Sequence, residues 1–164
     1  MMYYCAYPSP VGRLLLTADE NALTGLWMDK TPPPGAREDG TREVLREAKR
    51  WLDGYFRGEA PKTLPPLAPE GTEFQKRIWR YLLEVPYGEV CTYGALARRA
   101  AADMGAERMS AQAVGGAVGR NPISIMIPCH RCVGANGSLT GYAGGLERKR
   151  WLLRHEQKKG ADLP

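Results

Sequence analysis

A proline-rich stretch at residues 58–69 divides this chain into two halves of different character. Four prolines fall within it, and each fixes its own backbone angle φ and lacks an N–H donor. Neither a continuous helix nor a central strand can run through such a segment. We therefore predict a boundary here, with one domain over residues 1–68 and a second over residues 69–164.

The first half has the pattern of a small sheet followed by one helix. Apolar, β-prone runs at residues 3–7, 13–18 and 23–28 are separated by turn sequences, which predicts a three-stranded antiparallel meander. A loop over residues 31–40 follows. Seven apolar residues then recur at helical spacing and predict a helix that covers the sheet: Val44, Leu45, Ala48, Trp51, Leu52, Tyr55 and Phe56. No residue of this half is a candidate for catalysis.

The second half is mainly helical. Thr72 and Gln75 form a capping-box pattern ahead of an apolar helical repeat that stops near Pro86. A last helix begins at Leu146, and residues 158–164 have the character of a loose tail. The predicted fold class is α/β (α+β), with a small antiparallel sheet and its covering helix followed by a mainly helical domain.

Two short helices in the second half resemble a helix-turn-helix. Thr92 is expected to cap the first of them, and Ser110 caps the second, over residues 111–119. The second helix is rich in small residues: Ala111, Ala113, Gly115, Gly116, Ala117 and Gly119. Glycine costs about 1 kcal/mol in a helix interior relative to alanine, so this composition needs a packing reason. Close packing against another protein helix and close approach to a nucleic-acid groove are the two alternatives.

A cysteine flanked by basic side chains is the chief candidate for chemistry. The apolar run at residues 123–126 predicts a short buried strand, and Pro128 stands directly before Cys129. The thiolate is the reactive form of cysteine, and positive charge from His130 and Arg131 would lower the pKa that controls it. The sequence therefore predicts an activated nucleophile facing a pocket, and a small buried residue beside a satisfied histidine is the alternative.

Two other cysteine chemistries are disfavoured. Cys129 and Cys132 have the spacing of a thioredoxin-like redox pair, but Gly134 and the Asn-Gly step at residues 136–137 follow where such a pair needs a helix. A zinc site lacks a second cluster at ligand spacing. Four cysteines without a secretion signal indicate reduced thiols in the cytoplasm, and no apolar run approaches the ~20 residues of a membrane span.

Charge divides unevenly along the chain. Residues 1–68 hold nine Lys/Arg and nine Asp/Glu, whereas residues 69–164 hold fourteen and nine, so the whole net charge of +5 lies in the second half. A basic half that carries the candidate nucleophile indicates a polyanionic partner, with nucleic acid as the first candidate.

Several blocks in the second half resemble one family, the O6-alkylguanine-DNA alkyltransferases. They are Ile-Pro-Cys-His-Arg at residues 127–131, Ala-Val-Gly-Gly-Ala at 113–117 with the following Asn121-Pro122, and Gly-Tyr-Ala-Gly-Gly-Leu at 141–146. The resemblance spans about residues 71–156. It implies a protein that rotates an alkylated guanine out of double-stranded DNA and transfers the alkyl group irreversibly to its own cysteine, once per molecule, with O4-alkylthymine as a second candidate substrate.

The resemblance also assigns roles. Cys129 is the acceptor, His130 draws its proton through a water, and Glu156 orients the imidazole. Tyr93 lies near the flipped base, and Asn121 ties the helix-turn-helix to the cysteine loop. The residues implied at the substrate or the DNA are Gln112, Ala113, Gly115, Arg131, Cys132, Tyr142 and Ala143. The expected partner is DNA, bound in the minor groove by a monomer without metal or cofactor, and His155 is expected to face solvent.

This chain departs from the family pattern at three points. Gln112 stands where the family usually has an arginine that fills the gap left by the rotated base, and it lacks the cation and the planar fork. Residues 98–109 are longer than in compact members. The N-terminal zinc site of some members is absent, because Cys5 is the only cysteine before Cys91. A lesion sensor that binds damage without repairing it is the alternative function.

Overall fold

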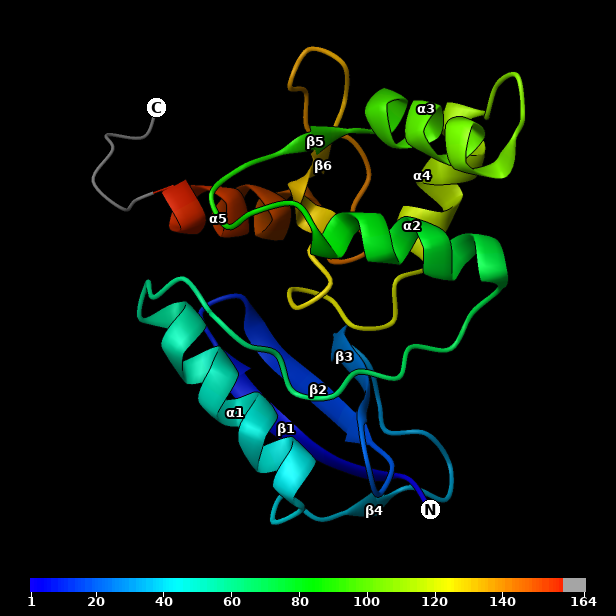
Figure 1. The fold of residues 1–164 in the computed structure, drawn as a ribbon. Coiled ribbons are helices and arrows are strands. Elements are labelled where there is room, and N and C mark those ends of the chain that lie inside the picture. Colours follow the sequence, from blue (N-terminus) through cyan, green and yellow to red (C-terminus); the bar gives the residue numbers. More distant parts are fainter. Residues whose placement is uncertain (158–164) are drawn as a thin grey trace.

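The computed structural model describes residues 1–157 and shows two halves that pack against each other (Figure 1). The blue-to-cyan N-terminal half is built on a sheet, and the green-to-red C-terminal half above it is built from helices. This arrangement confirms the predicted fold class. The tail predicted at residues 158–164 lies outside the described residues. Within the described part of the chain, every helix is too short or too polar to cross a bilayer.

The N-terminal sheet has one strand more than predicted. Strands β1 (Tyr3–Ser9), β2 (Gly12–Ala18) and β3 (Leu23–Met28) form the expected antiparallel meander. The loop predicted over residues 31–40 contains β4 (Arg37–Glu38), which pairs parallel with β1 and gives the order β3-β2-β1-β4. Two residues at a sheet edge carry no measurable periodicity, so the sequence pattern could not reveal this strand.

Helix α1 (Glu43–Phe56) covers the sheet as predicted (Figure 1). Its buried side chains are Val44, Leu45, Ala48, Leu52 and Tyr55. Burying a leucine contributes about 1.5–3 kcal/mol, and Leu45 and Leu52 are both fully buried. The apolar stripe therefore fixes which face of α1 meets the sheet.

The C-terminal half holds helices α2 (Glu73–Leu83), α3 (Tyr93–Met104), α4 (Ala111–Gly119) and α5 (Leu146–Gln157). Helices α3 and α4 form the predicted helix-turn-helix and pack on α2. Between them, Gly105 ends α3 in the left-handed conformation that glycine tolerates. The Nε1 of Trp79 on α2 donates a hydrogen bond of 2.9 Å to a carbonyl of α4, which fixes the two helices together.

The helix starts agree with the sequence signals. Thr72 Oγ1 accepts from the Gln75 N–H at 3.1 Å, while the Gln75 side chain accepts from the Thr72 N–H at 2.9 Å, which completes the capping box. Thr92 and Ser110 cap α3 and α4, each accepting from the backbone N–H three residues later. Each capping residue lies within three positions of the N–H group that it binds, so neighbouring residues alone determine where these helices start.

The edge of β3 carries parts of both halves of the chain. Leu23 forms a parallel bridge with Leu67 of the linker, and Leu26 forms one with Ile123 in the loop that precedes Cys129. The strand predicted at residues 123–126 is wrong, because beyond that single bridge the segment is a turn. An apolar run that is buried on all sides satisfies the same pattern as a buried strand.

An aromatic cluster forms a second junction, between α1, α5 and the turn after α2. Its members are Trp51, Tyr55, Phe56, Tyr87, Trp151 and His155. His155 stacks on Trp151 with ring centroids 4.8 Å apart, and its Nε2 lies 2.5 Å from the Tyr55 carbonyl oxygen. The prediction that His155 faces solvent is therefore wrong.

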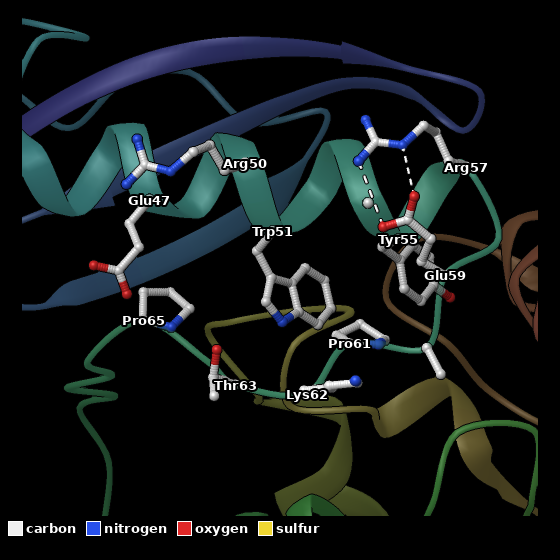
Figure 2. A pocket seen from close by; sticks show the side chains of 12 residues that line it. Glu47, Arg50, Trp51, Tyr55, Arg57, Glu59, Pro61, Lys62, Thr63 and Pro65 are labelled. Atoms are coloured by element: carbon white, nitrogen blue, oxygen red, sulfur yellow. Dashed lines mark hydrogen bonds and ion pairs between the residues drawn. The ribbon is translucent and has the colours of Figure 1, made fainter.

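A cavity of about 500 Å³ lies beside this junction, between α1 and the linker (Figure 2). Trp51 projects from α1 toward the linker prolines Pro61 and Pro65, and an ion pair of 2.9 Å between Arg57 and Glu59 stands at one end. None of the predicted site residues lines this cavity.

Candidate active site

Cys129 lies at the end of a tightly held loop, at the start of the 3-10 helix η1 (Cys129–Arg131). Its side chain is buried. Asn121 clamps the loop: its Nδ2 donates to the Ile127 carbonyl at 2.7 Å, and its Oδ1 accepts the Ile123 N–H at 2.9 Å. Ile125 has a φ of 72°, a left-handed conformation that is strained for a β-branched residue. The clamp thus stabilises a loop conformation that the backbone alone disfavours.

A cavity of about 750 Å³ includes Cys129 in its wall, within the size range of small-molecule sites. Its other walls come from α3, α4 and the glycine-rich loop at residues 134–143. Six more of the predicted site residues line it: Tyr93, Gln112, Gly115, Asn121, Tyr142 and Ala143. The buried Tyr142 hydroxyl makes no hydrogen bond within residues 1–157, so a ligand in the cavity is its natural partner.

The face of α4 that carries the small residues points away from the protein. Ala111, Gln112, Ala113 and Gly116 are exposed. A Cβ added at Gly116 would meet nothing within 4 Å, and one at Gly115 would meet only the Tyr93 ring at 4.0 Å. Ala117, by contrast, is buried, and Trp79 of α2 donates to its carbonyl, so packing inside the protein accounts for Ala117 but not for the exposed Ala111, Ala113 and Gly116.

A buried carboxylate, Glu156 of α5, lies behind the cysteine and receives donors from two other elements and a turn. Glu156 Oε2 lies 2.5 Å from His130 Nε2 and accepts the Tyr55 hydroxyl at 2.7 Å. Arg131 donates from Nε to Oε1 at 2.8 Å and from Nη2 to Oε2 at 3.1 Å. The Gly88 N–H adds a longer contact of 3.4 Å. The Glu156 carboxylate therefore joins α5, η1, α1 and the turn after α2.

These contacts set the protonation states of Glu156 and His130. Burial alone would raise the pKa of Glu156, but hydrogen bonds and charge from His130 and Arg131 lower it to about 2. Burial lowers the pKa of His130, against the opposing pull of Glu156. An ionised carboxylate only accepts, so His130 Nε2 carries the proton and Nδ1 keeps its lone pair. Nδ1 is buried and has no partner among the described residues, which suits a base.

The electrostatic surroundings of the Cys129 thiol differ from those predicted from the sequence. Burial raises the pKa of Cys129, and a hydrogen bond with Asn121 and the charge of Lys149 only partly oppose this. The prediction that His130 and Arg131 lower this pKa is wrong, because the histidine is neutral and the arginine pairs with Glu156. The thiol therefore needs a base to remove its proton during the reaction.

Lys149 supplies the positive charge nearest this site, from the buried side of α5. Its Nζ donates to the carbonyls of Cys132 at 2.6 Å and Thr140 at 2.8 Å, with a longer contact of 3.4 Å to Gly141. Burial lowers the pKa of this amine. Lys149 thus ties the glycine-rich loop to the segment that follows the acceptor.

Two family models cover almost the whole chain. The DNA-binding domain of 6-O-methylguanine DNA methyltransferase matches residues 73–158, and the ribonuclease-like domain of the same proteins matches residues 2–68. The chain belongs to the 6-O-methylguanine DNA methyltransferase family.

Relatives within this methyltransferase family are similar along their full length. The methylated-DNA--protein-cysteine methyltransferase of Methanosarcina acetivorans is 46% identical over 161 residues, covering 94% of this chain and 98% of its own. That of Haemophilus influenzae is 45% identical, covering 95% and 87%. The crystal structure of the Mycobacterium tuberculosis O6-methylguanine methyltransferase superposes with a TM-score of 0.83 at 41% identity, covering 98% and 96%. A structure of the M. tuberculosis protein in complex with DNA gives 0.82 at 41% identity, covering 94% and 92%.

Two residues that the resemblance placed at the substrate of this methyltransferase lie elsewhere. Arg131 is buried against Glu156 and donates from Nη1 to the Val85 carbonyl at 2.7 Å, outside the walls of the cavity. Cys132 is fully buried in the short parallel pair β5 (Cys91–Thr92) and β6 (Cys132–Val133), where its thiol contacts that of Cys91. Both side chains lie behind the residues that line the cavity, and neither side chain lines the cavity itself.

Two residues that complete the site are not among those predicted from the sequence. Tyr55 belongs to the apolar stripe of α1, and Lys149 carries no sequence signal of its own. The single signal for Tyr55 was a hydroxyl on an otherwise apolar face. For Lys149 no local signal existed, because only the packing of α5 reveals its burial.

Proposed function

We propose that this protein repairs O6-methylguanine and related O6-alkylguanines in DNA by transferring the alkyl group to Cys129. The observation that carries the proposal is the buried Cys129 thiol in the wall of the cavity of about 750 Å³, which has room for a base, with the His130–Glu156 pair behind the thiol. The family relationship supports the same activity.

The chemistry follows from the protonation states. His130 Nδ1 takes the Cys129 proton through a bridging water, since residues adjacent in sequence make a poor direct hydrogen bond. The sulfur then attacks the alkyl carbon, the S–C bond forms and the C–O6 bond breaks. The electron pair leaves with the guanine oxygen, and a hydrogen bond from Tyr93 stabilises the departing base. The thioether is stable, so each molecule reacts once.

DNA is the proposed partner of the exposed α4 face. The M. tuberculosis relative has been crystallised in complex with DNA. Small residues at Gly115 and Gly116 permit close approach to a minor groove, and the exposed Arg98, Arg108 and Arg120 of the same motif can contact phosphates. Gln112 lines the cavity from α4 and would fill the space of the rotated base.

The decisive experiment weighs the intact protein after incubation with a duplex containing one O6-methylguanine. A gain of one methyl group, about 14 Da, mapped to Cys129 and absent in Cys129→Ser, is the expected result. Binding of the duplex without any gain in mass would instead assign the protein to the lesion sensors.

A further inference from the structure

We propose that Tyr55, a residue of the N-terminal half, is a positioning residue for the transfer reaction: its hydroxyl holds Glu156 and limits how strongly that carboxylate pulls on His130. The proposal rests on the proposed function. Tyr55 does not line the cavity that contains Cys129 and does not contact Cys129 itself, so it acts only through Glu156.

The geometry of Tyr55 leaves its hydroxyl a single role. The residue is fully buried in the last turn of α1, stacked on Trp51 with ring centroids 5.4 Å apart and edge-on to Tyr87. Figure 2 shows it leaving α1 near Trp51, at the end of the helix where the linker starts. Burial and then the charge of Glu156 hold its pKa well above the ordinary value, so the phenol stays protonated. It therefore donates its proton to Glu156 Oε2.

Oε2 is also the oxygen that contacts His130 Nε2. Arg131 Nη2 donates to the same oxygen at 3.1 Å, so three donors share Oε2 and each weakens the attraction available to the others. Removing the phenol hydroxyl leaves more of the negative charge for the imidazole N–H, which favours the protonated imidazolium. An imidazolium cannot accept the Cys129 proton, so the site would be inactive over a wider range of acid pH.

Three charged groups of residues 1–157 act on His130: Glu156 and Lys149 from α5, and Arg131 from η1. Arg131 and Lys149 both disfavour the imidazolium, whereas Glu156 favours it. The Tyr55 hydroxyl modifies the Glu156 contribution alone.

A second contact keeps the fold intact when the hydroxyl is removed. The Tyr55 carbonyl faces His155 Nε2 at 2.5 Å, so α1 remains bound to α5 through its main chain and its stacked ring. Tyr55→Phe is therefore a local change at Glu156. Tyr7→Phe is the matched control, because the Tyr7 hydroxyl donates to the Asp53 carboxylate at 2.6 Å in the same half of the protein, away from the site.

The test measures single-turnover methyl transfer from duplex O6-methylguanine between about pH 5.5 and pH 9 for wild type and both variants. For Tyr55→Phe we expect the acid limb of the rate profile to move to higher pH. At about pH 6 the rate should fall by on the order of threefold, with a smaller change on the alkaline plateau. Tyr7→Phe should follow wild type.

A profile for Tyr55→Phe identical to wild type, or lowered by one factor at every pH, would overturn the proposal. Alkylation of Cys129 by iodoacetamide without DNA supplies an independent readout of thiol deprotonation, and its acid limb should move in the same direction. If wild type transfers no methyl group, the proposed function fails, and the iodoacetamide profile still decides the role of Tyr55.

Discussion

Replacing Glu156 with glutamine tests whether the buried network both stabilises the fold and prepares the base. The pKa of Glu156 falls from an ordinary 4.5 to about 2 in the folded protein. At about 1.4 kcal/mol for each pH unit, the ionised carboxylate contributes about 3 kcal/mol to the free energy of unfolding. The folded value lies below the unfolded one, so this contribution is complete above about pH 5 and is lost as the pH falls toward 2.

The variant also leaves the buried Arg131 guanidinium without its counter-charge. Breaking a buried pair in this way typically costs about 3–5 kcal/mol, so we expect Glu156→Gln to lose that much stability at about pH 7. At about pH 3 the wild type has itself lost roughly 2 kcal/mol of the stability that the ionised carboxylate contributes. The difference in the free energy of unfolding between wild type and Glu156→Gln should therefore narrow by that amount.

Urea unfolding at about pH 7 and pH 3, at equal ionic strength, measures this difference in the free energy of unfolding. Glu43→Gln is the control, because Glu43 is an exposed carboxylate that pairs with Arg50 at 2.9 Å and should change stability little at either pH. A gap between wild type and Glu156→Gln that stays constant with pH would refute the argument, since it would mean that the charge of Glu156 is not what stabilises the fold.

Three further changes test the site and the DNA face. Gln112→Arg should speed repair of duplex DNA but not of free O6-alkylguanine base, and equal effects on both substrates would contradict a role in filling the gap left by the rotated base. Gly116→Ala should raise the free energy of unfolding by about 0.5–1 kcal/mol while weakening duplex binding in a titration; unchanged binding would remove α4 from the interface. Asn121→Leu should leave the strained Cys129 loop unclamped, lowering the transfer rate and the midpoint of thermal unfolding together, whereas a normal rate would show that the clamp is dispensable.

Much of this protein could be predicted without coordinates. The capping box at Thr72, the start of α4 at Ser110 and the apolar stripe of α1 depend on residues a few positions apart, so the covalent chain places their partners within reach. The five-residue context of Cys129 marked the family, and the charge imbalance between the halves agreed with a nucleic-acid partner.

Long-range packing decided the rest. Tyr55 and Glu156 are 101 positions apart in the sequence, and no pattern predicts their hydrogen bond, which exists only because α1 and α5 meet across the aromatic cluster. The resemblance implied that Arg131 lies at the substrate, yet η1 turns its side chain away from the cavity and against Glu156. The sequence by itself indicated the α-helices that the structure describes and the three strands of the meander, and it singled out Cys129, because those signals come from neighbouring residues. Only the tertiary structure decided which charges surround that thiol, because burial and pairing are properties of segments that meet after folding.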